Sequence, residues 1–251
     1  MPALNPIGKP FIELLSVEST NNYAMGLARA GMAQHGTAVF THEQTKGRGQ
    51  RQRNWISEKG KNIAMSIIVE PKMLQSSEIF LLSMMAAVGV RQLLGQVVND
   101  KIDIKWPNDI YWRDRKAAGI LIENIWQGNE WKFAVVGIGI NVNQTEFREL
   151  DQRAVSLKMI TAKELMPMDL AKELCDWLEE KFQLLTRLPE AIVRDYKSHL
   201  YKRNQLVKLK KDNRLFEATI RDVTTAGALV VEHAVEESYN VGDVEWIVNG
   251  A

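Results

Sequence analysis

Apolar positions in the first hundred residues switch between helical spacing and continuous runs. A Ser-Thr-Asn cluster at 19–21 precedes small and apolar residues three and four apart, and Gly31 suits the end of such a helix. Residues 62–70 are almost wholly apolar, which is typical of a buried strand. We therefore expect, in order, a helix over 16–31, strands over 37–43 and 62–70, and a mostly buried helix over 77–97.

The pattern changes between residues 102 and 142, where β-rich runs follow one another. The runs IDIKW, IYW, AAGILIENIW and WKFAVVGIGINV are separated by PND, RDRK and QGNE, each of which suits a turn. Two amphipathic segments, 169–186 and 190–200, follow and predict helices. The order of elements predicts an α/β (α+β) fold built on a mixed sheet.

The last part of the chain reads differently again. Between 205 and 248, four or five short strands are split by KDNR, TTAG and AVEES, a pattern typical of a small barrel. We expect two domains, a catalytic domain over 1–202 and a small barrel over 203–251.

Composition excludes several classes of protein. The chain has 251 residues, 45% hydrophobic and 25% charged, with a net charge of +1, so the whole surface is not an electrostatic nucleic-acid binder. The single cysteine, Cys175, excludes an internal disulfide and fits a reducing compartment. No apolar run approaches the roughly 18 residues of a membrane span, and no leader opens the chain. We expect a cytoplasmic protein that binds no membrane.

One strongly basic segment, HEQTKGRGQRQRNW at 42–55, stands out against this balanced charge. Its glycines can adopt positive φ or allow close approach of a ligand, and they leave N–H groups free to point at an anion. Arginines supply forked donors for phosphate or carboxylate, and a tryptophan can stack on a base. A solvated basic loop is the alternative. The glycines fit neither GxxxxGK[ST] nor GxGxxG. The residues concerned are Gln44, Gly47, Gly49, Arg48, Arg51, Arg53 and Trp55.

Two further segments carry candidate chemistry. In KWPND, Asp109 is either an ordinary turn residue or a ligand for magnesium or a ribose hydroxyl. Lys116 precedes AAGIL, where small residues such as Gly119 leave space above a strand, so it can reach a phosphate or a ligand carbonyl; a surface lysine is the alternative. In GIGINVN, the two glycines at 137 and 139 indicate either a β-bulge or a ligand close to the strand, to which Asn141 would present its amide.

The order of these segments resembles that of the biotin–protein ligases, also called biotin–acetyl-CoA-carboxylase ligases. The resemblance covers about residues 15–145 through STN, QTKGRGQRQRNW, KWPND, DRKAAGIL and GIGINVN, and continues more loosely to the family's small SH3-like C-terminal barrel. It implies a catalytic domain of the biotin/lipoate ligase type. The implied activity converts biotin and ATP to biotinoyl-5′-AMP and transfers the biotinoyl group to a lysine of a biotin carboxyl carrier domain.

The resemblance also implies roles for residues. It places Asp109 at a magnesium ion, Trp55 on the adenine, and Lys116 at the reacting carboxylate and phosphate. The arginines of the basic segment and Lys116 would be catalytic. For biotin it implies Ser19, Thr20, Asn21, Gln44, Gly47, Arg48, Gly49, Lys116 and Gly119, and for the nucleotide Arg51, Arg53, Trp55, Lys116 and Asn141.

The chain departs from the family pattern at two positions. The family's GRGRRGRxW is GRGQRQRNW here, so Gln50 replaces an arginine and Gln52 a glycine. Loss of the cation predicts a weaker hold on the adenylate, and loss of the glycine a stiffer loop. About 15 residues precede STN, too few for the helix-turn-helix domain of the repressor members, so we expect the ligase-only form.

Alternatives remain open. A lipoate or octanoate–protein ligase shares the two-step logic, and a non-catalytic biotin binder or a transcriptional regulator belongs to a different class. The resemblance is compatible with a monomer or a homodimer. We expect no nucleic-acid partner, and we expect the C-terminal barrel to pack near the nucleotide or the carrier.

Overall fold

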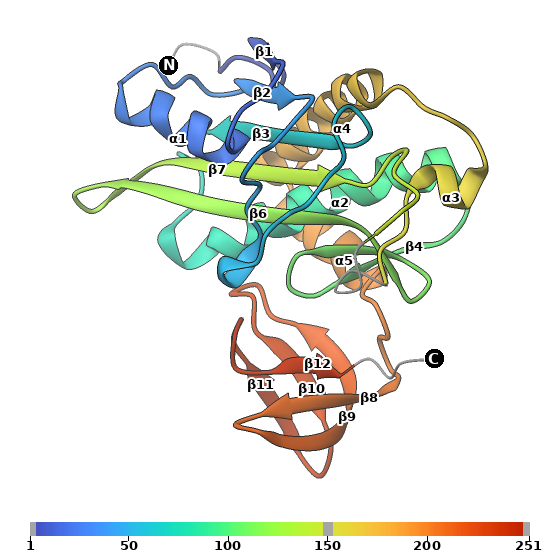
Figure 1. Cartoon of the computed structure of the whole chain (residues 1–251). Helices are drawn as coiled ribbons and strands as arrows, with labels where there is room; N and C mark the ends of the chain where they lie inside the picture. Colours follow the sequence, from blue (N-terminus) through green and yellow to red (C-terminus); the bar gives the residue numbers. More distant parts are fainter. Residues whose placement is uncertain (1–3, 148–152, 248–251) are drawn as a thin grey trace.

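The computed structural model describes residues 4–147 and 153–247; of Gln52 it describes the backbone but not the side chain. Its largest element is a seven-stranded mixed sheet (Figure 1). The strand order is β1-β2-β3-β7-β6-β5-β4, and only the β1–β2 pair is parallel. The strands are β1 (Phe11–Leu14), β2 (Ala38–Thr41), β3 (Ile63–Val69), β4 (Ile102–Lys105), β5 (Asp109–Trp112), β6 (Arg115–Gln127) and β7 (Glu130–Ile140).

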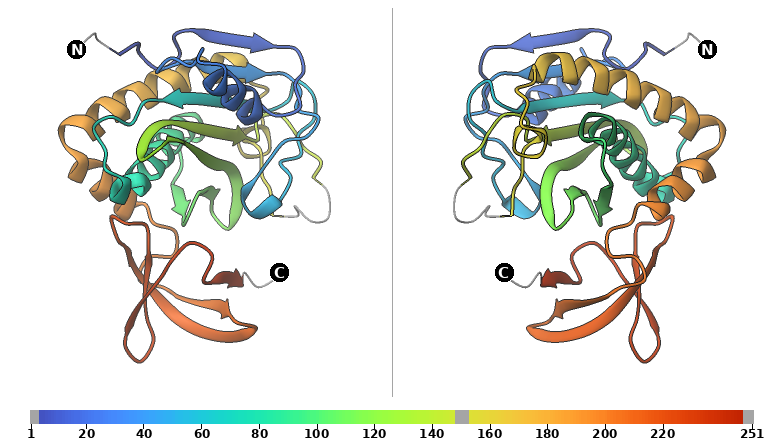
Figure 2. Two further views of the ribbon diagram at one scale, coloured as in Figure 1. Left: turned by 90° about the vertical axis from the view of Figure 1, so that its left-hand side faces the viewer. Right: turned by 90° about the vertical axis from the view of Figure 1, so that its right-hand side faces the viewer.

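Helices cover the two faces of this sheet unequally (Figure 2). The long helices α2 (Ile79–Val98) and α4 (Pro167–Arg187), with α5 (Pro189–Ser198), bury the main hydrophobic core on one face. On the opposite face α1 (Thr20–Arg29) packs over a smaller cluster that includes Ala24, Ile68 and Val135. The rest of that face is left for the candidate site.

Helix α2 contradicts the expectation that no apolar run approaches the length of a membrane span. Residues 76–98, which add the short 3-10 turn η2 (Ser76–Glu78), are long and apolar enough to cross a membrane by length and composition. In the structure this helix is mostly buried, and Leu82 and Met85 lie fully inside the core. A hydrophobic-all-round helix of this kind is the centre of a globular fold.

The C-terminal strands form a second, antiparallel sheet in the order β11-β10-β9-β8-β12, which is consistent with the expected SH3-like barrel. It lies below the larger sheet in Figure 1. Helix α5 ends eight residues before β8 begins, so the expected boundary near 203 falls in this connection. The strands are β8 (Leu206–Lys211), β9 (Arg214–Val223), β10 (Leu229–Glu232), β11 (Glu236–Tyr239) and β12 (Glu245–Ile247).

Three short elements were not predicted: β1, the 3-10 turn η1 (Gln50–Gln52) and helix α3 (Leu157–Thr161). The first helix is also shorter than the predicted 16–31, because residues 16–18 run parallel to the segment after β2 and the helix begins only at Thr20. Ser19 caps it, its Oγ accepting the Asn22 N–H at 3.4 Å. A serine at this position satisfies one of the free N–H groups of the first turn.

Candidate active site

Polar side chains meet in a buried patch between the start of α1 and strand β3. The Gln44 carboxamide oxygen accepts hydrogen bonds from the backbone N–H of Thr20 at 2.9 Å and from its hydroxyl at 3.2 Å. Ser66 Oγ lies 2.7 Å from Thr20 Oγ1 and 2.6 Å from Asn21 Oδ1. All but Gln44 are buried. These side chains therefore form a hydrogen-bonded network at the floor of a hollow, where hydrogen bonds to a polar ligand can replace those within the protein.

The two glycines of β7 lie against protein side chains. A Cβ at Gly137 would overlap the Asn21 carboxamide, and one at Gly139 would overlap the Trp55 indole. Both residues keep regular register with β3 and β6, so the alternative of a β-bulge is wrong at these positions. The expected close approach to these two glycines is confirmed, but the groups that approach them are the side chains of Asn21 and Trp55.

The basic segment folds back on itself through its glycines. The Gly49 N–H donates to the Arg53 carbonyl at 2.7 Å, so it is not free to point at an anion as expected. A Cβ at Gly47 would overlap the Trp55 carbonyl, which explains the glycine there by close approach of backbone. Neither glycine has positive φ. The left-handed residue is Arg51, at a φ of 53°.

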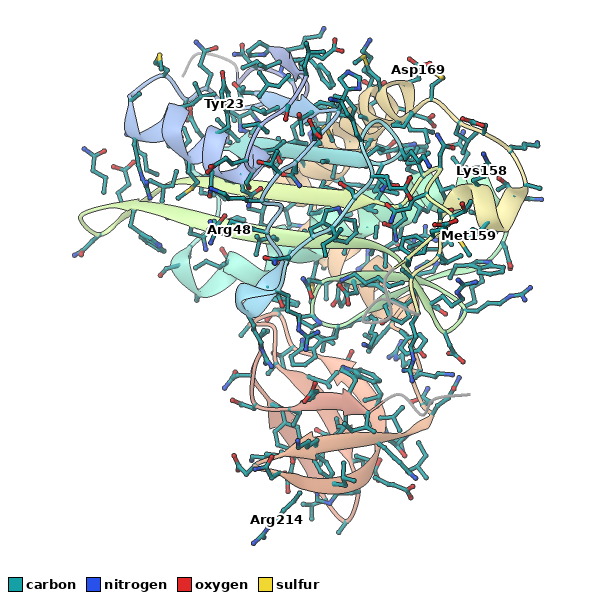
Figure 3. All side chains as sticks on the ribbon, viewed as in Figure 1. Tyr23, Arg48, Lys158, Met159, Asp169 and Arg214 are labelled. Atoms are coloured by element: carbon teal, nitrogen blue, oxygen red, sulfur yellow. The ribbon has the colours of Figure 1, made fainter. Side chains whose placement is uncertain are left out.

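The three arginines of this segment point to different parts of the protein. Arg48 lies over the β6–β7 region on the face that α1 covers (Figure 3). Its Nη1 donates to Asn22 Oδ1 at 2.9 Å and pairs with Glu123 Oε1 at 3.0 Å. Arg53 pairs with Glu245 of β12 at 3.7 Å, and the Arg51 guanidinium lies beside Gly242. One arginine thus faces the hollow under α1 and two face the barrel.

Lys116 and Asp109 form the central charged pair. Lys116 Nζ lies 2.6 Å from Asp109 Oδ1 and 5.7 Å from the centre of the Trp55 ring. Asp109 is the first residue of β5, directly after the turn that contains Pro107, so the turn explanation holds for its backbone while its carboxylate faces the lysine. Gly119 lies under the Lys116 side chain and Trp55, as the expected space above the strand requires.

Asn141 is buried and uses its amide inside the protein. Its Nδ2 lies 3.4 Å from the Lys116 carbonyl and 3.3 Å from the Val155 carbonyl, so it holds the backbone that carries Lys116. It also borders the cleft between the seven-stranded sheet and the barrel. Presentation of this amide to a ligand stays a prediction.

Two adjoining hollows meet at Lys116 and Trp55. The smaller, with about 460 Å³ of empty space including its solvent-filled mouth, extends over the polar patch and strand β7. The larger, with about 1770 Å³ of empty space including open solvent, lies between the seven-stranded sheet and the barrel. The smaller is lined by Ser19, Thr20, Asn21, Gln44, Arg48, Gly49, Gln50 and Gly119, and the larger by Arg51, Arg53, Lys105, Asp109, Asn141, Arg153, Glu245 and Trp246.

Two further features concern a possible metal site and a possible nucleophile. In residues 4–147 and 153–247 there is no cluster of three or more His, Cys, Asp or Glu side chains that could hold a metal ion. Burial raises the pKa of the Cys175 thiol to about 12, and its sulfur lies 3.9 Å from that of Met65. A thiol so far from ionisation is a packing residue.

Sequence reasoning missed several residues of this site. Ser66 and Glu123 complete the polar network, and Lys105, Arg153 and Trp246 border the larger hollow. Lys105 stood inside the quoted motif KWPND without a role. Ser66 and Glu123 lie in strands whose pattern signals only burial, and their partners are 45 and 102 residues away in sequence. No local signal could have paired them.

The chain is similar in sequence to a family of known ligases. The Biotin/lipoate A/B protein ligase family matches residues 14–141, about half of the chain. The bifunctional ligase/repressor BirA of Escherichia coli is 34% identical over 148 residues, covering 59% of this chain and 44% of that protein. The biotin–[acetyl-CoA-carboxylase] ligase of Paracoccus denitrificans is 36% identical over 134 residues, covering 51% of this chain and 53% of that protein. The chain thus spans about half the length of these relatives.

A solved structure extends the similarity to the whole fold. The biotin protein ligase of Aquifex aeolicus, in complex with biotin and ATP, superposes with a TM-score of 0.80 at 25% identity. The match covers 94% of this chain and 98% of that one, so the barrel is included with the larger sheet. With its ordered motifs, its mixed sheet and its two joined hollows, the chain belongs to the biotin/lipoate A/B protein ligase family.

Proposed function

We propose that this protein is a biotin–protein ligase, which joins biotin to ATP as biotinoyl-5′-AMP and passes the biotinoyl group to a carrier lysine. The observation that carries the proposal is the junction of a small, polar-floored hollow with a large cation-lined one at Lys116. The names of the relatives and the biotin and ATP in the Aquifex complex support the same substrates.

The small hollow suits the bicyclic ring of biotin. A ureido group has one carbonyl and two N–H groups, and the floor offers hydroxyls and carboxamides of Ser19, Thr20, Asn21 and Gln44. Buried polar groups of this kind select a ligand that satisfies them and reject one that leaves them unpaired. Lipoate and octanoate carry no such group at that end, which favours biotin over the lipoate-type alternative.

The first step requires two anions to meet. An oxygen of the biotin carboxylate attacks the α-phosphorus of ATP, and pyrophosphate leaves as the new P–O bond forms. Lys116, at the junction, is positioned to leave Asp109 for these oxygens, and charge held in a preformed site lowers the barrier. The arginines of the basic segment add positive potential. Magnesium would come as part of the ATP substrate, and one carboxylate such as Asp109 suits an ion held mainly by phosphates.

The second step needs no nucleophile from this protein. The carrier lysine amine attacks the acyl carbon, AMP leaves with the mixed-anhydride oxygen, and the amine loses a proton. We propose a biotin carboxyl carrier domain as the partner, acting with a monomer or homodimer of this chain. The cytoplasm is the proposed compartment, consistent with a lone reduced thiol at Cys175.

The test is biotin-dependent exchange of pyrophosphate into ATP with magnesium, run beside lipoate and octanoate. Exchange with biotin alone is expected, followed by labelling of a carrier domain. Exchange with lipoate or octanoate instead would assign the other acid class. Absence of exchange with every acid would reassign the chain as a binder or a disabled enzyme.

A further inference from the structure

Lys105 is a cation of the larger hollow that the proposed reaction has not yet used. It ends strand β4, and its ammonium lies 3.3 Å from the Tyr111 hydroxyl and 4.9 Å from the centre of that ring. On its other side the Trp246 ring of the barrel is 5.5 Å away. The lysine is thus held between the larger sheet and strand β12.

No carboxylate among the described residues forms an ion pair with this ammonium. The nearest acids along the chain are already engaged, Asp103 with Lys101 at 2.9 Å and Asp109 with Lys116 at 2.6 Å. Burial lowers the pKa of Lys105, and the negative charge of Asp109 offsets this lowering only in part. Aromatic faces compensate a buried cation incompletely. An ammonium in a cleft that forms an ion pair with no carboxylate in residues 4–147 and 153–247 indicates an anion that comes from outside.

The position of Lys105 tells which anion. Lys116 borders both hollows and so stands where the carboxylate and the α-phosphate meet. Of the two hollows, Lys105 borders the larger alone, and its ammonium lies near Trp246 of the barrel. With the adenine on Trp55, as the resemblance implies, and the α-phosphate at Lys116, the part of the cleft beside Lys105 is available for the remaining phosphates.

We propose that Lys105 binds the β- and γ-phosphates of ATP, and so the departing pyrophosphate, with Trp246 holding its ammonium in place. This inference rests on the proposed function, since it assumes that ATP occupies the larger hollow. It divides the work of two lysines: Lys116 lies beside the acyl-phosphate, which is present in both steps, and Lys105 serves only the step in which pyrophosphate is present.

The test compares Lys105→Met with Lys105→Arg, and uses Lys101→Met as a matched control. Lys101 lies on the same approach to β4, but its side chain is 71% exposed and paired with Asp103. Four quantities are measured: the KM for ATP and the KM for pyrophosphate in biotin-dependent exchange, the rate of transfer from synthetic biotinoyl-AMP to a carrier domain, and the melting temperature without ligand.

For Lys105→Met we expect both KM values to rise at least about tenfold, which corresponds to about 1.4 kcal/mol of binding. Transfer from supplied adenylate should stay within twofold of wild type, and the melting temperature should not fall, because an unneutralised buried charge is removed. Lys105→Arg should recover part of the affinity, and Lys101→Met should behave as wild type. Trp246→Leu should raise the same KM values to a smaller extent.

Equal loss of adenylation and transfer in Lys105→Met would overturn the proposal in favour of a structural role, and so would unchanged KM values. If the wild-type protein shows no exchange with any acid, the proposed function fails separately. Calorimetry with inorganic pyrophosphate then decides for Lys105: binding by wild type and its loss in Lys105→Met would sustain the phosphate site, and equal binding would end it.

Discussion

At the scale of single residues, the site depends on close contacts that leave no room for a side chain. Gly137 and Gly139 lie next to Asn21 and Trp55 on neighbouring positions of one face of β7. Side chains alternate across a strand, so both positions face the same hollow. The glycines therefore set the depth at which a ligand ring can lie above the sheet.

Gly137→Ala tests this depth. The new methyl group would displace the Asn21 carboxamide, which bonds Ser66 and Glu123, and we expect biotin affinity to fall by at least about tenfold. Isothermal calorimetry with biotin measures it. Gly95→Ala is the control, since its Cβ would meet nothing within 4 Å and a helix prefers alanine. Unchanged affinity in Gly137→Ala would contradict a tight Asn21 contact.

Gln50 stands where the family has an arginine, and it lines the smaller hollow. Gln50→Arg adds a cation beside the site of the acyl-phosphate, so we expect slower escape of biotinoyl-AMP into solution. Adenylate release is followed by trapping of free biotinoyl-AMP during turnover without carrier. A release rate equal to wild type would refute a role for Gln50 in retention. The side chain of Gln52, the other departure, lies outside the described residues.

At the scale of elements, the basic segment is held down at one point by strand β6. Glu123 bonds Asn21 Nδ2 at 2.9 Å through one oxygen and pairs with Arg48 at 3.0 Å through the other. Its side chain is only 21% exposed, so solvent screens this pair less than a surface pair. A single carboxylate thus joins the floor of the smaller hollow to the segment that covers it.

We expect Glu123→Ala to speed biotin dissociation several-fold, because Arg48 loses its partner and the covering segment opens more often. Stopped-flow dissociation of biotin measures it, with Glu130→Ala as the control on the far end of the same hairpin, where the carboxylate is 61% exposed. In a double-mutant cycle, additive effects of Glu123→Ala and Arg48→Ala would show that the two residues are not coupled.

Much at this scale could be predicted from the sequence, for reasons visible in particular segments. Strand β3 and helix α2 follow from apolar runs, and the order of the site segments follows from their motifs. The bonds of Gly49 could not be foreseen, because its N–H turns inward to Arg53 rather than outward to an anion. Strand β1 was missed because its short, half-buried run has no clear alternation, and pairing with β2 decides its conformation.

At the scale of the whole molecule, the β9–β10 turn of the barrel contacts the turn after β4 and helix α2. Trp106 Nε1 donates to the Gly227 carbonyl at 2.9 Å, and the Phe80 ring lies where a Cβ of Gly227 would be. Gly227 has a φ of 94°, which a side chain rarely adopts. The turn thus requires glycine both for its backbone and for its contact.

Gly227→Val should therefore loosen the barrel. We expect a loss of at least about 2 kcal/mol of stability, since a β-branched residue is strained at this φ and also overlaps Phe80. Denaturant unfolding measures the stability, and limited proteolysis reports whether the barrel detaches. Biotin affinity should change less than ATP affinity, because only the larger hollow includes barrel residues. Equal losses of both would argue against this division.

The contribution of β12 to the larger hollow has a consequence during synthesis. Every strand of the larger sheet lies within residues 11–140, and the smaller hollow is lined entirely by residues 19–139. Glu245 and Trp246 are made more than a hundred residues later. The residues that line the proposed biotin pocket are therefore synthesised, with the whole larger sheet and the helices that cover it, before the barrel residues that complete the proposed nucleotide cleft.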